Sequence, residues 1–227
     1  NQIDYLWKKQ PLFPTSRAFY HQSKYAGVES NIKINKIQKN LKLKSIDYYF
    51  LSSLDSIAWL LNIRGNDIRH TPLIWCYIII PSEGKIELFI NIKKIIHLKN
   101  LTKQVNLNKF ENINKFIKMI DKKKVFGFDK NISSYHFINL CLDNDILVKN
   151  YENPCLYLKA IKNNVELQGA IDANIRDGVS ITKFIYWLKT RNKIKDISEI
   201  TASNYLLKLR KKNKLYYSPS FETISAF

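Results

Sequence analysis

The sequence predicts an α/β fold with at least some parallel strands, and this prediction rests on the order and spacing of its apolar residues. Helix-like and strand-like segments alternate through residue 150, which is typical of strands joined by helical crossovers. Apolar residues recur at helical spacing within 107–120. Two strand-like runs, at 73–80 and 85–91, are separated by Pro81-Ser82-Glu83-Gly84, which indicates a hairpin.

Residues 1–29 are expected to form an irregular lead-in. Pro11 and Pro14 would interrupt a helix there, and four aromatic side chains would anchor the segment by burial. These are Trp7, Phe13, Phe19 and Tyr20. Ser30 is then the expected N-cap of a helix that runs to about Lys44. The face that this helix would bury consists of Ile34, Ile37 and Leu41.

The other elements expected before residue 150 follow from short apolar runs and from helical spacing. The expected strands are 46–51, 73–80, 85–91, 125–128 and 146–148. The expected helices are a short one after Ser53, one over 107–120 and one over 133–142, with a turn at 64–67.

After Pro154 the pattern changes, and we expect a boundary near 155–160. Residues 163–188 form one long predicted amphipathic helix. Its expected core face consists of Leu167, Ile171, Ile175, Val179 and Ile185. Asp196 and Glu199 resemble a capping box for a second helix that runs to about Lys212. Tyr216-Tyr217 and 221–227 then suggest the start of a new β element.

The chain has 227 residues and a formal net charge of +18, which raises the possibility of a nucleic-acid partner. Only six of its 37 basic residues are Arg, although Arg is the usual reader of phosphates and base edges. Lys, Ile and Asn make up 86 residues, as AT-rich coding DNA would produce. The charge is also spread along the whole chain. Specific nucleic-acid binding is therefore kept only as an alternative, which DNA titration at two salt concentrations tests.

No catalytic, cofactor-binding or metal-binding residue is assigned. Phosphate-loop, dinucleotide-binding and HExxH motifs are missing from the sequence. The four histidines, His21, His70, His97 and His136, are scattered, and a structural role is expected for His136. Asp143 and Asp145 fit a solvated turn. Asp172 and Asp177 do not share a helix face, and Arg176-Asp177 is interpreted as a local ion pair or a cap.

Three sparse cysteines, Cys76, Cys141 and Cys155, are expected to be buried thiols in a reducing, cytoplasmic compartment. The longest apolar run, 73–80, is too short for a transmembrane helix, so no membrane partner is expected. The chain starts without an initiator Met or a signal peptide. We therefore expect it to begin inside a longer protein, or to be processed or trimmed.

Two stretches resemble the Xaa-Pro aminopeptidases. The first, at 54–68, reads LDSIAWLLNIRGNDI and is followed by Pro72. The second reads KAIKN at 159–163 and continues with Glu166, Gly169, Ala173, Arg176-Asp177-Gly178, Phe184 and Trp187-Leu188. Smaller similarities lie at Ile3-Asp4, Trp7, Pro11, Tyr25-Ala26-Gly27 and 220–226. The chain departs from the family at Asn164 and Asn174, where Glu and His are usual; neither position is a metal ligand.

The resemblance implies three segments. Residues 1–29 would be a linker from a missing first domain, and 30–157 a creatinase N-terminal-like domain with a mixed sheet and flanking helices. Residues 158–227 would be the two-helix opening segment of a truncated catalytic domain of the pita-bread fold. Because 159–227 would leave the apolar faces of two helices without their full partner, the chain is expected to form a homodimer or a segment-swapped oligomer, or to fold this segment back on the first domain.

The resemblance also implies a chemistry. The family is a hydrolase that removes the N-terminal residue before a penultimate proline from short peptides, using two metal ions, usually manganese. Two Asp, one His and two Glu hold these ions, and all five would lie beyond Phe227. This metalloprotease chemistry therefore belongs to the complete enzyme, and the chain alone is expected to be inert, with no cofactor of its own. The alternative is a non-catalytic interaction or dimerisation module left by gene decay.

Overall fold

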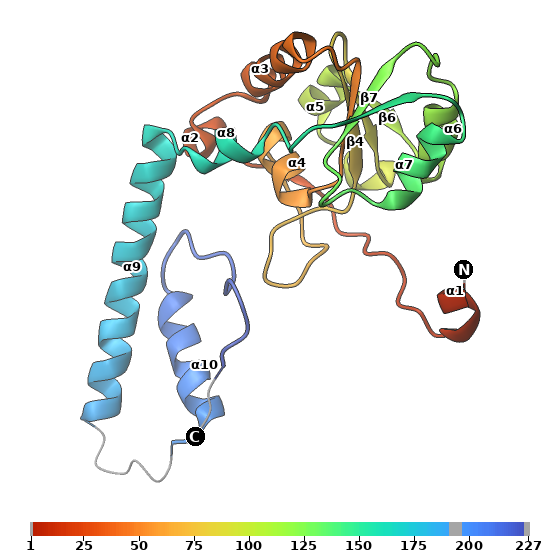
Figure 1. Cartoon of the computed structure of the whole chain (residues 1–227). Helices are drawn as coiled ribbons and strands as arrows, with labels where there is room; N and C mark the ends of the chain where they lie inside the picture. The colour runs from red at the N-terminus through yellow and green to blue at the C-terminus, as the bar shows by residue number, and fades with distance from the viewer. Residues whose placement is uncertain (1, 191–196, 225–227) are drawn as a thin grey trace. The chain divides into compact units, whose positions relative to one another are not determined.

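The computed structural model describes residues 2–190 and 197–224 (Figure 1). The chain divides into two compact units. Unit 1 is built from 2–21, 29–68 and 72–160, and unit 2 from 22–28, 69–71 and the described residues after 160. Within the described part of the chain, every helix is too short or too polar to cross a bilayer.

Unit 1 contains short helices around one main sheet. Its helices are α1 (Gln2–Leu6), α3 (Ser30–Leu43), α4 (Leu54–Leu61), α5 (Lys99–Gln104), α6 (Ile113–Lys118), α7 (Tyr135–Leu142) and α8 (Leu156–Ala160), with 3-10 turns η1 (Ile92–Lys94) and η2 (Phe110–Asn112). Its strands are β1 (Phe19–Tyr20), β2 (Tyr48–Leu51), β3 (Ile63–Arg64), β4 (Tyr77–Pro81), β5 (Ile86–Phe89), β6 (Val105–Asn108), β7 (Val125–Phe128) and β8 (Leu147–Asn150).

The main sheet is mixed, as predicted. Its strand order is β6-β5-β4-β2-β7-β8. Strand β4 is antiparallel to both β2 and β5, and the β4–β5 pair is the expected hairpin. The pairs β5–β6, β2–β7 and β7–β8 are parallel. The α/β class and the mixed sheet with flanking helices are therefore confirmed.

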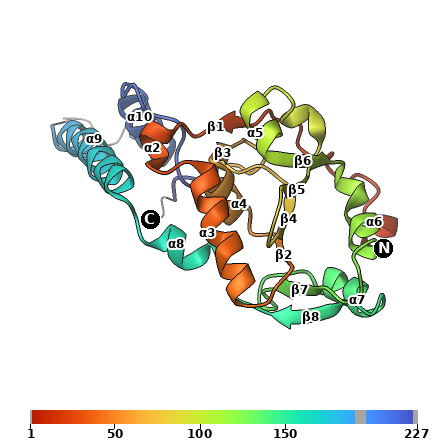
Figure 2. The same cartoon turned by 90° about the horizontal axis from the view of Figure 1, so that it is seen from above.

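The two faces of the sheet carry separate hydrophobic cores, because successive side chains of a strand point to opposite faces. On β2, Tyr49 and Leu51 join the core that includes residues of α3 and α4, whereas Phe50 joins an aromatic core that includes residues of α6 and α7. Figure 2 shows the sheet with these helices around it. The ring centroids of Phe50 and Phe137 lie 4.7 Å apart in the second core. Two covered faces explain why β2 and β4 read as continuous apolar runs.

Several sequence predictions need correction in unit 1. The lead-in contains short elements, and its aromatic residues do not anchor it by burial: Trp7 is 54% and Phe13 71% exposed, and Phe19 and Tyr20 are also exposed. The small side chain of Ala18 is buried there instead. Helix α3 buries its predicted face, but its N-cap is Glu29. The hydroxyl of Ser30 instead donates to the carbonyl of Leu60 at 2.9 Å.

The predicted helix over 107–120 is wrong at its start. Leu107 lies in β6 and pairs with Leu88 of β5, and the helical segment begins only at Phe110. Leu107 is apolar because it packs against the core of the sheet, and its fit to the helical period of the following residues is a coincidence. Pairing with β5 therefore outweighs the local helical pattern.

Unit 2 contains α2 (Ser23–Ala26), α9 (Asn164–Lys189) and α10 (Glu199–Arg210). Helices α9 and α10 pack side by side (Figure 1). The rings of Trp187 and Tyr205 stack with centroids 4.1 Å apart. The guanidinium of Arg210 donates two hydrogen bonds, of 2.6 and 2.9 Å, to the Asp177 carboxylate. Asp177 therefore pairs across helices, and the predicted local pair with Arg176 is wrong.

Three further predictions for unit 2 have different outcomes. The predicted core face of α9, Leu167 to Ile185, is exposed in this structure, because the face toward α10 is the opposite one. Residues 216–224 form no strand, and 225–227 lie outside the described residues. Asp196 also lies outside them. The cap of α10 is instead Ser198, whose hydroxyl accepts from the Thr201 amide at 3.2 Å.

The start of α9 is fixed by Asn163. Its Oδ1 accepts from the amides of Val165 and Glu166 at 3.0 Å, and its Nδ2 donates to the carbonyl of Ala26 at 2.9 Å. Gly27 lies against this amide with φ +71°, and a Cβ at Gly27 would overlap the Asn163 side chain. The cap therefore requires glycine at 27 for space as well as for backbone conformation.

We expect Gly27→Ala to lower the free energy of unfolding by about 2 kcal/mol or more, because it adds backbone strain and displaces the cap. Chemical denaturation followed by circular dichroism measures it. Gly84→Ala is the matched control, since Gly84 has φ +94° but nothing within 4 Å of a Cβ. Equal losses in the two variants would show that the contact with Asn163 is unimportant.

Candidate functional site

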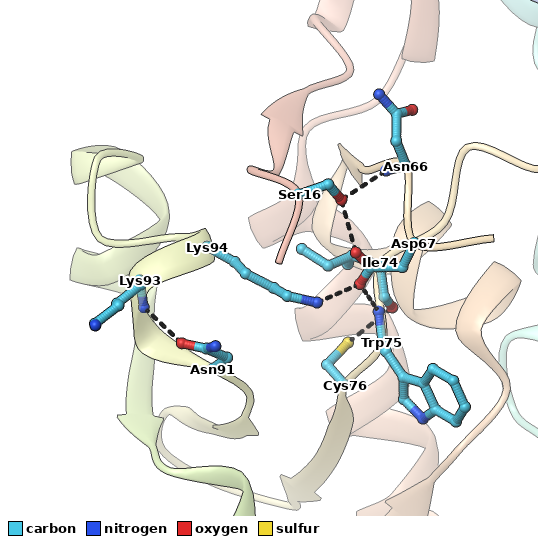
Figure 3. A network of polar contacts seen from close by, with 9 residues as sticks. All are labelled: Ser16, Asn66, Asp67, Ile74, Trp75, Cys76, Asn91, Lys93 and Lys94. Carbon is cyan, nitrogen blue, oxygen red and sulfur yellow. Dashed lines mark hydrogen bonds and ion pairs between the residues drawn. The ribbon is translucent and has the colours of Figure 1, made fainter. Parts of the chain in front are cut away.

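A buried polar cluster of unit 1 is centred on Asp67, in the stretch that resembles the aminopeptidases (Figure 3). The Asp67 side chain is fully buried, the Lys94 side chain is 4% exposed, and Lys94 Nζ lies 2.6 Å from Asp67 Oδ2. The Trp75 amide donates to the same oxygen at 2.7 Å, and the Ser16 hydroxyl donates to Oδ1 at 2.6 Å. Each carboxylate oxygen thus has a close partner, and we call Ser16, Asp67, Trp75 and Lys94 the Asp67 cluster.

The chain around Asp67 is arranged to bring these groups together. Arg64 donates to the carbonyl of Ala58 at 2.8 Å, so it satisfies the C-terminal end of α4 just before the loop begins. The amides of Gly65 and Asp67 bond to the carbonyls of Pro72 and Leu73, which holds the two limbs of the loop together. Lys94 reaches Asp67 from η1, and its own carbonyl accepts from Ala18 at 2.9 Å.

The geometry of the Asp67 cluster indicates a structural role and not a catalytic one. The carboxylate accepts from three donors within unit 1, and removing one partner of such a buried ion pair is strongly destabilising. Because its side chain is fully buried, Asp67 lacks the access to substrate that a general base needs. The cluster ties the lead-in, the loop and η1 into one rigid corner of unit 1.

The other titratable residues singled out from the sequence are separated in the structure. His97 Nε2 lies 2.8 Å from the carbonyl of Ala18, and His136 Nε2 lies 3.3 Å from Asn114 Oδ1. In unit 2, His70 Nδ1 lies 3.3 Å from the carbonyl of Pro219. The backbone amide of His21 donates to Asn62. These four histidines do not form a common site.

The acidic residues are also engaged separately. Asp145 pairs with Lys122 at 2.6 Å on the surface, as expected for a solvated turn, and this ion pair lowers its pKa. The Asp172 carboxylate accepts a hydrogen bond from the side-chain amide of Gln168, which lies four residues earlier in α9. Among residues 2–190 and 197–224, no three His, Cys, Asp or Glu side chains are grouped to hold a metal ion. The donor set present here therefore does not fit a two-metal centre.

The three cysteines are buried and unpaired, as predicted. Burial raises the pKa of Cys76, Cys141 and Cys155 to about 12. A thiol with so high a pKa is almost entirely protonated at neutral pH, and the protonated form is a poor nucleophile. None of the three is suited to nucleophilic catalysis.

Unit 2 contains an open cavity of about 680 Å³ beside α9 and α10. Its walls include the Asp177–Arg210 pair, Arg176, Asn213 and Tyr216. The volume would admit a small ligand, but the charged groups on its wall are only Arg176 and the paired Asp177 and Arg210. The cavity by itself therefore indicates no particular ligand.

Residues 9–166 match the family described as the creatinase/prolidase N-terminal domain, which is more than half of the chain. The chain belongs to this family. This creatinase-type chain is also 32% identical over 243 aligned residues to a protein named probable Xaa-Pro aminopeptidase P from Blastomyces gilchristii. The alignment covers 100% of the chain but 39% of that relative. The predicted resemblance to the Xaa-Pro aminopeptidases is thus confirmed.

Solved structures support the same fold. The creatinase-type chain superimposes on the X-prolyl aminopeptidase of Caenorhabditis elegans with a TM-score of 0.88 and 24% identity, over 100% of this chain and 38% of that one. That protein is described as a cytosolic enzyme with a di-nuclear active site. A prolidase from Thermococcus sibiricus matches with a TM-score of 0.58 and 16% identity, over 81% of this chain and 50% of the other.

Proposed function

We propose that this chain is a portion of an Xaa-Pro metalloaminopeptidase, whose complete form removes the N-terminal residue before a penultimate proline. The observation that carries the proposal is an alignment that covers the whole chain and only 39% of a protein named for this activity. The segments 1–29, 30–157 and 158–227 are proposed as linker, creatinase-type domain and incomplete catalytic segment. The end of unit 1 at residue 160 lies near the proposed boundary between the second and third segments, whereas the family match begins at residue 9, before the proposed start of the creatinase-type domain at 30.

The chain alone is proposed to be catalytically inert. A pair of metal ions, proposed as manganese, would supply an activated water and a polarised carbonyl in the complete enzyme. Nothing in the described part of the chain groups enough carboxylates and histidines for it. The buried Asp67 is already paired with Lys94. We therefore assign no catalytic step to a residue of this chain.

We expect no release of arginine when the 227-residue chain is incubated with Mn²⁺ and the peptide Arg-Pro-Pro. The full-length Blastomyces gilchristii relative, assayed in parallel, is the positive control. Metal-dependent turnover by the chain would contradict its proposed inertness. Failure of the relative to cleave the same peptide would instead remove the support for the substrate class.

A cytoplasmic location and peptide substrates complete the proposal. The Caenorhabditis elegans neighbour is described as cytosolic, and three unpaired buried cysteines fit a reducing compartment. Specific nucleic-acid and membrane partners are not part of it. The alternative, a non-catalytic interaction module, is favoured by one observation, the exposed apolar face of α9.

A further inference from the structure

The segment 216–224 of unit 2 follows α10 and is neither helix nor strand. It nevertheless forms much of the wall of the cavity beside α9 and α10. The backbone amide of Tyr216 donates to the carbonyl of Asn213 at 3.0 Å, and the Ser203 hydroxyl of α10 lies 3.0 Å from Thr223 Oγ1. A segment without regular backbone hydrogen bonding depends on such individual contacts to keep its position.

A loop tip from elsewhere in the sequence supplies further contacts to this segment. Residues 69–71 belong to unit 2, although the chain on either side of them belongs to unit 1. Arg69 Nη1 lies 2.6 Å from Glu222 Oε1, and His70 Nδ1 lies 3.3 Å from the carbonyl oxygen of Pro219. His70 Nε2 lies 3.7 Å from the same Glu222 oxygen. Two neighbouring side chains of the loop tip therefore contact the segment at two positions.

The two contacts differ in their exposure to water. A carbonyl oxygen can only accept a hydrogen bond, so His70 Nδ1 carries the proton and donates to Pro219. The His70 side chain is 20% exposed, whereas the side chains of Arg69 and Glu222 are 80% and 61% exposed. Because water screens exposed ion pairs, we expect the histidine to contribute more than the arginine.

The backbone conformation of His70 supports a role for its side chain. His70 has φ +63°, in the left-handed region, which is unfavourable for a residue with a Cβ. Non-glycine residues keep such a conformation where the surrounding contacts hold them in it. Glycine would adopt it at no steric cost, so a histidine at this position indicates that the imidazole is used.

We propose that Arg69 and His70 form a latch, which holds 216–224 in place as a wall of the unit 2 cavity. All of its contacts lie within unit 2, and the inference does not depend on the proposed peptidase function. When the latch is released, the segment should open while α9 and α10 stay packed together. The two helices are joined by the Asp177–Arg210 ion pair, which the latch residues do not take part in.

Limited proteolysis of the 227-residue chain tests the latch, because chymotrypsin cleaves after the exposed Tyr217 and Phe221 when the segment opens. His70→Gly should speed cleavage at these sites by about 5-fold, since the hydrogen bond to Pro219 is lost. Glycine tolerates the left-handed conformation, so the variant should stay folded, as circular dichroism will show. His136→Ala removes an exposed imidazole from unit 1 and should leave the rate unchanged. A rate for His70→Gly no higher than that of the parent chain would overturn the proposal.

Two substitutions of Arg69 test the ion pair without altering the residues around the cleavage sites. Arg69→Glu should speed cleavage by about 3-fold, because it places two carboxylates together at Glu222. Arg69→Lys keeps the positive charge and should cleave at close to the parent rate. Added salt should reduce the difference between the two variants, since it screens exposed charges. Equal rates for the two variants at low salt would contradict the part assigned to Arg69.

Discussion

Replacing Asp67 with alanine is expected to lower the free energy of unfolding by about 3–5 kcal/mol, because it leaves the buried Lys94 ammonium unpaired. The Asp67 side chain is fully buried and that of Lys94 is 4% exposed, so water cannot replace the lost carboxylate. The Ser16 hydroxyl and the Trp75 amide also lose their acceptor. Urea denaturation at neutral pH measures the effect.

The surface pair Lys122–Asp145 is a matched control, since it has the same 2.6 Å separation but is 67% and 75% exposed. Asp145→Ala should change stability little, because exposed ion pairs contribute little. The double variant Asp67→Asn/Lys94→Met should recover part of the loss, since it leaves no buried charge. If Asp67→Ala and Asp145→Ala had equal effects, burial would not be the source of the stabilisation.

The fold could be predicted where local pattern and tertiary environment agree. The strand 125–128 matches β7, because its apolar run is buried on both faces. The start of α9 is also close, since Asn163 and Glu166 form a capping box that is local in sequence. Leu107 was misassigned because its helical spacing conflicts with strand pairing to Leu88, which lies far away in the sequence.

The Asp67 cluster could not be derived from spacing. Ser16 and Lys94 lie 51 and 27 residues from Asp67, and each is an ordinary polar residue in its own segment. Only the resemblance at 54–68 pointed to this loop, and it gave no partner for Asp67. The predicted burial of the aromatic residues in the lead-in was wrong for a related reason. Aromatic side chains are buried on average, but in this segment it is Ala18 that contacts the core.

The three buried thiols should make the protein sensitive to alkaline pH. In the unfolded chain a cysteine ionises near pH 9, but burial raises each of the pKa values in the folded protein to about 12. Above pH 9 the unfolded state therefore holds fewer protons than the folded state, and the free energy of unfolding falls as pH rises. Below pH 9 both states are protonated and this effect vanishes.

The free energy of unfolding is expected to fall steeply with pH in this range. One thiol contributes a loss of about 1.4 kcal/mol per pH unit between its unfolded and folded pKa, so three contribute about 4 kcal/mol per unit. Burial also raises the pKa of Tyr49, which adds to the loss at still higher pH. Urea midpoints measured across this range, with reducing agent present, give the slope.

Substituting Cys76, Cys141 and Cys155 with alanine separates the thiols from other alkaline effects. All other titratable groups are common to both proteins, so the difference in slope belongs to the cysteines. The triple variant will be less stable at neutral pH because it leaves small cavities, but its stability should fall more slowly above pH 9. Parallel slopes would mean that the thiols gain access to water before the protein unfolds. In that case, a thiol reagent should label the native chain at the rate of an exposed cysteine.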